Sequence, residues 1–247
     1  MPVDTEELVT RLRAARAVVV VTGAGVSAAS GVPTFRGKDG LWRNFRSEDL
    51  STPEAFAHDP RTVWEWYDWR RSTIAGCKPN AAHDVLAKWS ARPGFTLITQ
   101  NVDGLHERAG TANVIRFHGS IWELRCAAEC GAPAWEDRTS PLPSLPPTCP
   151  SCGGLARPGV VWFGETIDPD VLERSSVAAE GAEVFLSIGT SAQVYPAAGL
   201  VHLAKRAGAF TVEINPGASD ASHTVDLPIA APAEDALPML DARVRMG

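Results

Sequence analysis

The sequence has no excess of basic residues and no long apolar run. Lysine and arginine number 23 against 29 aspartates and glutamates, which gives the 247-residue chain a net charge of −6. A mildly acidic chain lacks the charge that holds nucleic acid, so we expect no nucleic-acid partner. The apolar run over residues 17 to 21 is too short for a signal-peptide core or a membrane span. We therefore expect a soluble, cytoplasmic protein that does not bind a membrane, and we expect a monomer.

Cysteine is scarce and odd in number: the chain has five, four of them in two close pairs. This count argues against a disulfide framework and for metal in a reducing compartment. Cys126 and Cys130 form a C-x3-C pair, and Cys149 and Cys152 form a C-x2-C pair after 18 further residues. The spacing predicts one tetrahedral structural zinc, with a redox pair as the weaker alternative. Four protein ligands leave no open position, so this zinc should hold a small lobe together, and Cys77 should be an ordinary buried thiol.

Residues 17 to 37 predict a buried strand followed by a glycine-rich turn. Val18 to Val21 are apolar without alternation, as in a parallel strand covered on both faces, and Gly23 and Gly25 follow. Glycine lets the chain turn sharply and brings backbone N–H groups close to a diphosphate, so the G-x-G-x-x-A pattern predicts a nucleotide-binding turn. A tight strand-to-helix turn that binds nothing has the same pattern.

The sequence after this turn differs from that of an ordinary dehydrogenase. A dinucleotide-binding fingerprint continues into an uninterrupted helix, and an acidic residue for the ribose follows about 20 residues later. Here residues 30 to 33 (Ser-Gly-Val-Pro) end the helix early, and residues 34 to 42 form a polar loop punctuated by glycine. We expect this loop, which contains Phe35 and Arg36, to lean over the nucleotide.

Four further apolar runs predict strands that end in polar residues. The predicted strands cover residues 95 to 99, 114 to 117, 184 to 188 and 210 to 214. The residues that follow them are Gln100, Asn101 and Asp103, then His118, then Gly189, Thr190 and Ser191, and finally Asn215 and Pro216. Ligands bind at the carboxyl ends of strands in open α/β sheets. Asn101 and Asp103 offer the donors and acceptors that an amide such as nicotinamide requires, or they serve as turn residues. His118 titrates near neutrality and suits a general base, the alternative being a structural histidine.

The segment from residue 44 to residue 77 reads as helical and rich in aromatic residues, with a helix start at residues 51 to 54. Tyr67 and Arg70 are three residues apart, so they share a helix face. A phenol and a guanidinium that converge make a receptor for a carboxylate. The alternative is that Arg70 is solvated and Tyr67 belongs to the core.

Taken in order along the chain, these motifs resemble the sirtuin family, the NAD-dependent protein-lysine deacylases. Residues 17 to 37 resemble its first signature, and residues 99 to 106 (Thr-Gln-Asn-Val-Asp-Gly-Leu-His) its second, in which His106 is structural. The Tyr67-x-x-Arg70 pattern after Val-Trp-Glu resembles the branch that removes succinyl, malonyl or glutaryl groups. In that branch a small residue, commonly alanine, precedes the Thr-Pro. Ser51 takes this place here, which leaves the preferred acyl chain length open.

The resemblance implies a role for each matching residue. The implied NAD-binding residues are Gly23, Ala24, Gly25, Ser27, Phe35, Arg36, Gln100, Asn101, Asp103, Gly189, Thr190, Ser191, Asn215, Pro216 and Ala233. The implied substrate-binding residues are Tyr67, Arg70, Val161, Phe163, Gly164, Glu165, Val194 and Tyr195, and His118 is the implied catalytic base. Ala231 departs from the glycine that the family usually has near the adenine. From its own residues, the segment from 157 to 165 suits either strand addition by a peptide or a hinge after the zinc lobe.

The implied fold is an α/β, Rossmann-like domain with a parallel sheet, made of residues 1–35, 78–120 and 156–247. Its small lobe comprises a helical insert, residues 36–77, and a zinc-binding insert, residues 121–155. The implied reaction transfers an acyl group, succinyl or malonyl more than acetyl, from a protein lysine to ADP-ribose and releases nicotinamide. In it the acyl oxygen attacks the ribose of NAD, and His118 deprotonates a ribose hydroxyl. A mono-ADP-ribosyltransferase, an NAD hydrolase or an NAD-sensing binding module would use the same NAD site.

Overall fold

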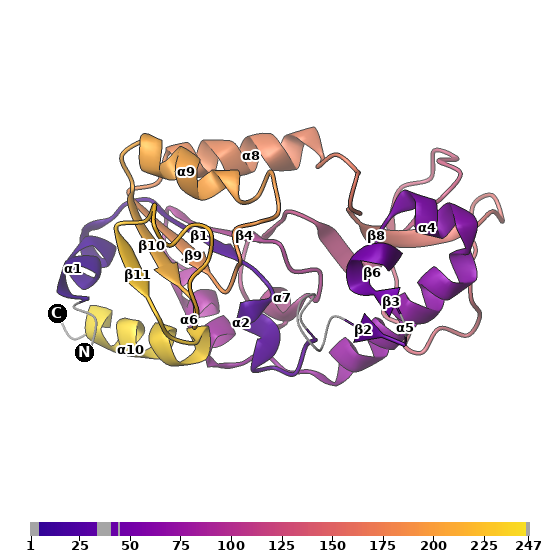
Figure 1. The fold of residues 1–247 in the computed structure, drawn as a ribbon, viewed down its shortest axis with the longest axis horizontal. Helices are drawn as coiled ribbons and strands as arrows, with labels where there is room; N and C mark the ends of the chain where they lie inside the picture. The colour runs from indigo at the N-terminus through magenta and orange to yellow at the C-terminus, as the bar shows by residue number, and fades with distance from the viewer. Residues whose placement is uncertain (1–4, 34–40, 44, 246–247) are drawn as a thin grey trace.

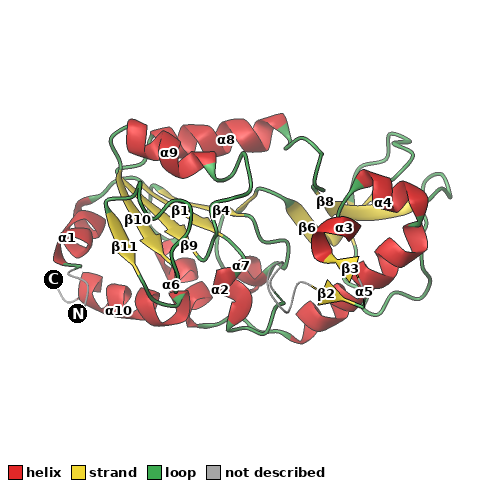
Figure 2. Cartoon of the chain, viewed as in Figure 1, coloured by secondary structure: helices red, strands yellow, loops and turns green. Residues whose placement is uncertain are grey.

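The computed structural model describes residues 5–33, 41–43 and 45–245. Figure 1 and Figure 2 show two lobes: a larger lobe with a parallel sheet between two layers of helices, and a small lobe that carries α4, α5, β6 and β8. Among the helices built from the described residues, none combines the length and the apolar character that crossing a bilayer requires.

All six strands of the larger sheet run parallel, in the order β11-β10-β9-β1-β4-β5. The strands are β1 (Val18–Thr22), β4 (Phe95–Thr99), β5 (Ile115–Arg116), β9 (Val184–Ile188), β10 (Phe210–Ile214) and β11 (Leu227–Ile229). Val18 of β1 pairs with Phe95 of β4 on one side and with Val184 of β9 on the other. After β1 the chain adds β4 and β5 on one side of β1, and later it adds β9, β10 and β11 on the other side. The connections at the carboxyl end of β1 therefore diverge, and a crevice opens there.

Helices cover both faces of this sheet, as the unbroken valine run predicts. One face packs against α1 (Glu6–Ala14), α6 (Ala81–Trp89) and α10 (Ala233–Arg245), and the other against α8 (Pro169–Glu180) and α9 (Gly199–Arg206). Val18 and Val20 point into the first core, and Val19 and Val21 into the second, because successive strand residues point to opposite faces. All four valines are buried, which accounts for the absence of polar alternation.

The small lobe has its own aromatic core. Its elements are the hairpin β2 (Leu41–Trp42) and β3 (Phe45–Arg46), the helices α3 (Ser47–Leu50), α4 (Pro53–His58) and α5 (Pro60–Gly76), and a sheet ordered β7-β6-β8 from β6 (Gly119–Cys126), β7 (Trp135–Glu136) and β8 (Ala156–Val160). Trp64, Trp66 and Tyr67 of α5 pack against Trp122 of β6 and Trp162. Two single-turn helices, α2 (Gly25–Ala28) and α7 (Leu105–Arg108), follow β1 and β4.

Two sequence-based expectations differ from the structure. The segment from 44 to 77 is three helices preceded by a hairpin strand, although the expected start is correct: Thr52 caps α4 by accepting a hydrogen bond from the Ala55 nitrogen at 3.1 Å. The implied return to the parallel-sheet domain at residue 156 is contradicted by β8, which begins there and belongs to the small-lobe sheet. β8 pairs antiparallel with β6, with Cys126 opposite Ala156, because the cysteine pairs lie at the end of β6 and just before β8.

Candidate active site

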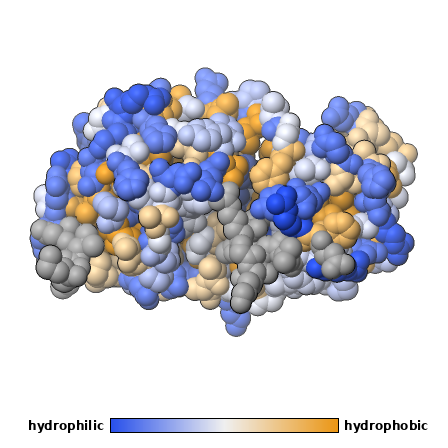
Figure 3. Space-filling view, viewed as in Figure 1, coloured by the Kyte–Doolittle hydropathy of each residue, from blue (hydrophilic) through white to orange (hydrophobic). Residues whose placement is uncertain are grey.

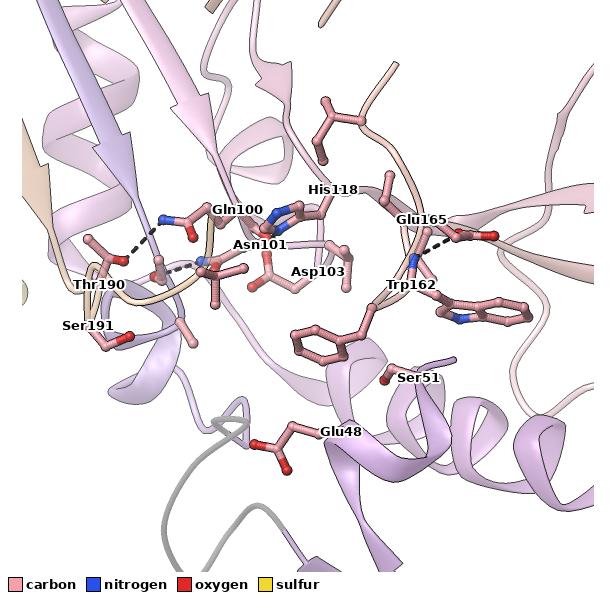
Figure 4. A pocket seen from close by; sticks show the side chains of 18 of the residues that line it. Glu48, Ser51, Gln100, Asn101, Asp103, His118, Trp162, Glu165, Thr190 and Ser191 are labelled. Atoms are coloured by element: carbon pink, nitrogen blue, oxygen red, sulfur yellow. Dashed lines mark hydrogen bonds between the residues drawn. The ribbon is translucent and has the colours of Figure 1, made fainter. Parts of the chain in front are cut away.

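A cleft of about 410 Å³ opens where the strands of the parallel sheet end and the small lobe begins. It is lined by 19 of the residues that the sequence singles out: Gly23, Ala24, Gly25, Ser51, Tyr67, Arg70, Gln100, Asn101, Asp103, His118, Val161, Phe163, Gly164, Glu165, Gly189, Thr190, Ser191, Val194 and Tyr195. Figure 4 shows His118 above Asn101 and Asp103, with Thr190 and Ser191 on one side and Trp162 and Glu165 on the other. In Figure 3 a notch with apolar side chains separates the α8 and α9 region from the small lobe.

Other predicted residues lie elsewhere. Ser27 is fully buried behind the cleft wall, and Ala233 is buried at the start of α10 in the core of the sheet. Asn215 reaches the strand-end loops through Nδ2, which donates to the Thr190 carbonyl oxygen at 3.5 Å, and Pro216 follows it. Phe35 and Arg36 fall outside the described residues.

Gly23 and Gly25 are required by the packing of two strand-end loops. A Cβ atom on Gly23 would lie 2.8 Å from the Gly189 carbonyl oxygen, and one on Gly25 would lie 2.8 Å from the Gly189 Cα. The Gly25 nitrogen donates to the Gly189 carbonyl oxygen at 2.8 Å. The loops after β1 and β9 are therefore in backbone contact, and a side chain at either glycine would force them apart.

Asn101, Asp103 and Ser27 form one hydrogen-bonded group at the end of β4. The Ser27 hydroxyl donates to Asp103 Oδ2 at 2.8 Å, and Asn101 Nδ2 donates to the Gly23 carbonyl oxygen at 3.0 Å. Asp103 Oδ1 accepts the Leu105 nitrogen at 2.8 Å. Burial raises the pKa of Asp103, while these hydrogen bonds counteract the shift. The group fixes two amide or carboxyl side chains at the floor of the cleft, where they suit an amide ligand.

His118 follows β5 and faces the cleft. Its Nδ1 atom lies 3.1 Å from the Gln100 carbonyl oxygen. Because a carbonyl oxygen only accepts hydrogen bonds, Nδ1 carries the proton and Nε2 keeps its lone pair. Burial lowers the pKa of His118 below its ordinary value of 6.5, so the imidazole is neutral at pH 7. Nε2 has no hydrogen-bond partner among the residues that the structure describes. A neutral imidazole with its Nε2 lone pair available is the form that a general base needs.

Tyr67 and Arg70 both line the cleft from α5, and both side chains are only 3% exposed. The interpretation of Arg70 as a solvated residue is therefore wrong. The Arg70 guanidinium lies 5.3 Å from the centroid of the Trp66 ring. Burial lowers the pKa of Arg70, and attraction to Tyr67 and Asp103 opposes that shift. Burial raises the pKa of Tyr67 to about 12, so its phenol keeps its proton.

The segment after β8 is fixed to both lobes through its backbone. The Val161 nitrogen donates to the His118 carbonyl oxygen at 3.0 Å, and the Phe163 nitrogen donates to the Ser51 carbonyl oxygen at 2.9 Å. The Trp162 nitrogen donates to Glu165 Oε2 at 2.8 Å. These three N–H groups are used within the protein, so they are not available to pair with an added peptide strand.

Glu165 is held inside this segment by arginines. Arg157 Nη1 and Nη2 lie 2.6 and 2.9 Å from its two carboxylate oxygens, and Arg125 Nη2 lies 3.3 Å from Oε2. These bonds lower the pKa of Glu165 against the opposing effect of burial. The carboxylate therefore ties the segment to β8 and β6.

The four predicted metal ligands form one cluster. The sulfur atoms of Cys126, Cys130, Cys149 and Cys152 all lie within 4.8 Å of one another. The Cys126 and Cys152 sulfurs are 3.6 Å apart, and those of Cys130 and Cys149 are 3.8 Å apart. Thiolates at about 2.3 Å from one tetrahedral zinc are separated by roughly 3.8 Å. The cluster fits one structural zinc, while Cys77 is buried outside it.

Sequence reasoning missed several residues of the cleft: Val32, Pro33, Glu48, Val102, Val160, Trp162, Ile167 and Pro196. Trp162 is the most informative, because its indole Nε1 donates to the Tyr67 hydroxyl oxygen at 2.8 Å. A tryptophan in a segment that suits peptide binding is a sequence signal for a site residue. The sequence does not show that its partner is Tyr67, because the two are 95 positions apart. Two buried histidines, His83 and His106, lie behind the cleft with ring centroids 4.9 Å apart.

The central strands of the parallel sheet end at a cleft that holds a half-buried, neutral histidine, and the four-cysteine lobe lies opposite. These features define a two-lobed α/β protein of the nucleotide-binding class. Residues 23–196 match the Sir2 family. The chain belongs to the Sir2 family, which confirms the sirtuin resemblance and its Rossmann-like fold.

The relatives and solved structures agree with this assignment. The NAD-dependent protein deacylase of Aquifex aeolicus (strain VF5) is 54% identical over 211 residues, 85% of this chain and 87% of the relative. NAD-dependent protein deacylase 1 of Archaeoglobus fulgidus is 46% identical over 242 residues, 97% of this chain and 98% of the relative. A Sir2 homologue in complex with NAD superposes with a TM-score of 0.92 at 44% identity, over 98% of this chain and 94% of that one. A Sir2–p53 peptide–NAD+ complex gives a TM-score of 0.85 at 28% identity, over 99% of this chain and all of that one. Together they support NAD-dependent protein deacylase activity.

Proposed function

We propose that this protein removes acidic acyl groups, succinyl or malonyl in preference to acetyl, from lysine side chains of proteins or peptides. NAD is the co-substrate, ADP-ribose accepts the acyl group, and nicotinamide is released. The observation that carries the acyl preference is the burial of a guanidinium and a phenol, Arg70 and Tyr67, in the wall of the cleft that also holds His118.

The charge of Arg70 explains this preference. A buried cation gains most from a ligand that brings a negative charge, because neither charge is screened by water. A carboxylate can accept two hydrogen bonds from the guanidinium and a third from the phenol. An acetyl group offers no carboxylate, so it would leave the buried cation without this partner. The solved Sir2–p53 peptide–NAD+ complex supports a peptide as the partner in this proposal.

The remaining residues supply the rest of the chemistry in this proposal. Asn101 and Asp103, braced by Ser27, hold the nicotinamide amide. Nε2 of His118 takes the proton of a ribose hydroxyl, while the Gln100 carbonyl oxygen keeps the proton on Nδ1. Because both substrates meet in one cleft between the lobes, proximity and the exclusion of water lower the barrier. The four-cysteine cluster holds the small-lobe sheet that forms the far wall.

Replacing Arg70 by Met tests the acyl preference. We expect the ratio of kcat/KM for a succinyl-lysine peptide to that for the matched acetyl-lysine peptide to fall at least tenfold, because a charged hydrogen bond contributes about 1.5–3 kcal/mol. Exposed Arg61 on the same helix is the control: Arg61→Met should leave the ratio unchanged. Equal losses on both peptides in Arg70→Met would show that Arg70 has no part in acyl selection.

A further inference from the structure

Trp162 connects Tyr67 of α5 to the segment that follows β8. Its indole Nε1 donates to the Tyr67 hydroxyl oxygen at 2.8 Å, and both side chains are 3% exposed. A hydrogen bond between two side chains in so dry a place is not exchanged with water, so it fixes the position of the phenol oxygen.

This bond also fixes what Tyr67 can donate. A phenol oxygen has one proton of its own and accepts hydrogen bonds through its lone pairs. The phenol has a second side-chain partner, Ser51, which also lines the cleft. Because the indole N–H already points at the oxygen, the phenol proton points away from Trp162, on the side of the cleft where Ser51 lies. Tyr67 lines the cleft, and burial raises its pKa to about 12, so the phenol remains a donor throughout the neutral range.

The indole itself has little freedom to move. The Arg157 guanidinium lies 3.4 Å from the centroid of the Trp162 ring, and the Phe56 ring lies 5.3 Å from it. Arg157 also binds both oxygens of Glu165, and Glu165 accepts the Trp162 backbone N–H at 2.8 Å. Arg157, Trp162 and Glu165 thus form a closed ring of contacts that sets the orientation of the indole.

We propose that Trp162 is a positioning residue for acyl selectivity: by donating to Tyr67, it directs the phenol proton toward the carboxylate of an acidic acyl group. This inference rests on the proposed function, since it needs a carboxylate in the cleft. Trp162 acts through Tyr67, and the Arg157–Glu165 pair holds the indole in place. The segment after β8 therefore takes part in recognition of the acyl group.

Replacement of Trp162 by Phe removes the N–H and keeps an aromatic ring for Arg157 and Phe56 to contact. We expect the succinyl-to-acetyl ratio of kcat/KM to fall about 3- to 10-fold, the effect of one hydrogen bond, and we expect the loss to appear mainly as a higher KM for the succinyl peptide. Trp64→Phe is the matched control. It removes a buried hydrogen bond of the same length, which Trp64 Nε1 donates to the Ala156 carbonyl oxygen. Trp64 lies in the same core as Trp162 but outside the cleft. Its ratio should not change.

The double variant separates positioning from general damage. If Trp162 acts through the phenol, Trp162→Phe should lower the ratio no further once Tyr67→Phe is present. Additive losses, or equal losses on both peptides, would overturn the inference. Should Trp162→Phe fail to fold, Arg157→Lys replaces it, because lysine keeps the charge beside Glu165 and loses the planar stack; an unchanged ratio there also overturns the inference.

The same variants distinguish a failure of the proposed function from a failure of this inference. If Arg70→Met and Tyr67→Phe both leave the ratio unchanged, the acidic acyl preference is wrong and the role of Trp162 with it. If both lower the ratio and Trp162→Phe does not, the preference holds and only the role of Trp162 is wrong.

Discussion

The Nδ1 atom of His118 lies 3.1 Å from the backbone carbonyl oxygen of Gln100, so the imidazole presents Nε2 to the cleft. The hydrogen bond sets the tautomer, and burial sets the charge.

The acid limb of the pH profile should lie below the ordinary histidine range. A base works when it is neutral, so kcat/KM rises as pH increases through its pKa, and burial lowers that pKa below 6.5. We expect the inflection in kcat/KM below pH 6.5 and a loss of about 10²- to 10⁴-fold in His118→Ala at pH 7.5. An inflection at or above pH 6.5, or near-normal turnover by His118→Ala, would contradict the role of His118.

Gly25→Ala should destabilise the protein. The new Cβ would lie 2.8 Å from the Gly189 Cα, which is backbone and cannot rotate away. We expect the free energy of unfolding in urea to fall by about 1–3 kcal/mol, the cost typical of overpacking. Gly76→Ala is the control, since a Cβ there meets no atom within 4 Å among the described residues, and its stability should be unchanged or slightly higher. Equal stabilities for the two variants would show that the strand-end loops separate easily.

The protein purified under reducing conditions should contain about one zinc per chain by elemental analysis. Cys149→Ser removes a buried ligand of the cluster, so it should lower both the zinc content and the thermal midpoint. Cys77→Ser should keep the zinc, because Cys77 lies outside the cluster. Full zinc content in Cys149→Ser would rule out the four-sulfur site.

Stability should fall as the pH is lowered from about 6.5 toward 3. Burial lowers the pKa of His106 to about 3 and that of His83 to about 4, so the folded protein keeps both neutral while the unfolded chain protonates them below pH 6.5. The free energy of unfolding should therefore decrease between pH 7 and pH 4. His106→Gln should reduce this decrease, whereas replacement of the exposed His58 by Gln should not. An identical pH dependence in wild type and His106→Gln would refute this assignment.

The strands and much of the site follow from local sequence. Apolar runs such as Val18 to Val21 predict the strands because burial on both faces demands them, and parallel strands bring Asn101, His118 and Thr190 to one edge. What a single sequence does not show is which distant segments pair. The β6–β8 pairing and the contact of Trp162 with Tyr67 depend on how the small lobe folds back on itself. The sequence predicts that Gly23 and Gly25 bind a diphosphate; what the structure shows is that they make room for Gly189.

The most direct test of the proposed function is nicotinamide release from NAD by the purified protein, with matched unmodified, acetyl-lysine and succinyl-lysine peptides. We expect release to depend on an acylated peptide and to be much faster with succinyl-lysine than with acetyl-lysine. Release that is the same with and without an acylated peptide would contradict the proposed deacylase function and favour an NAD hydrolase.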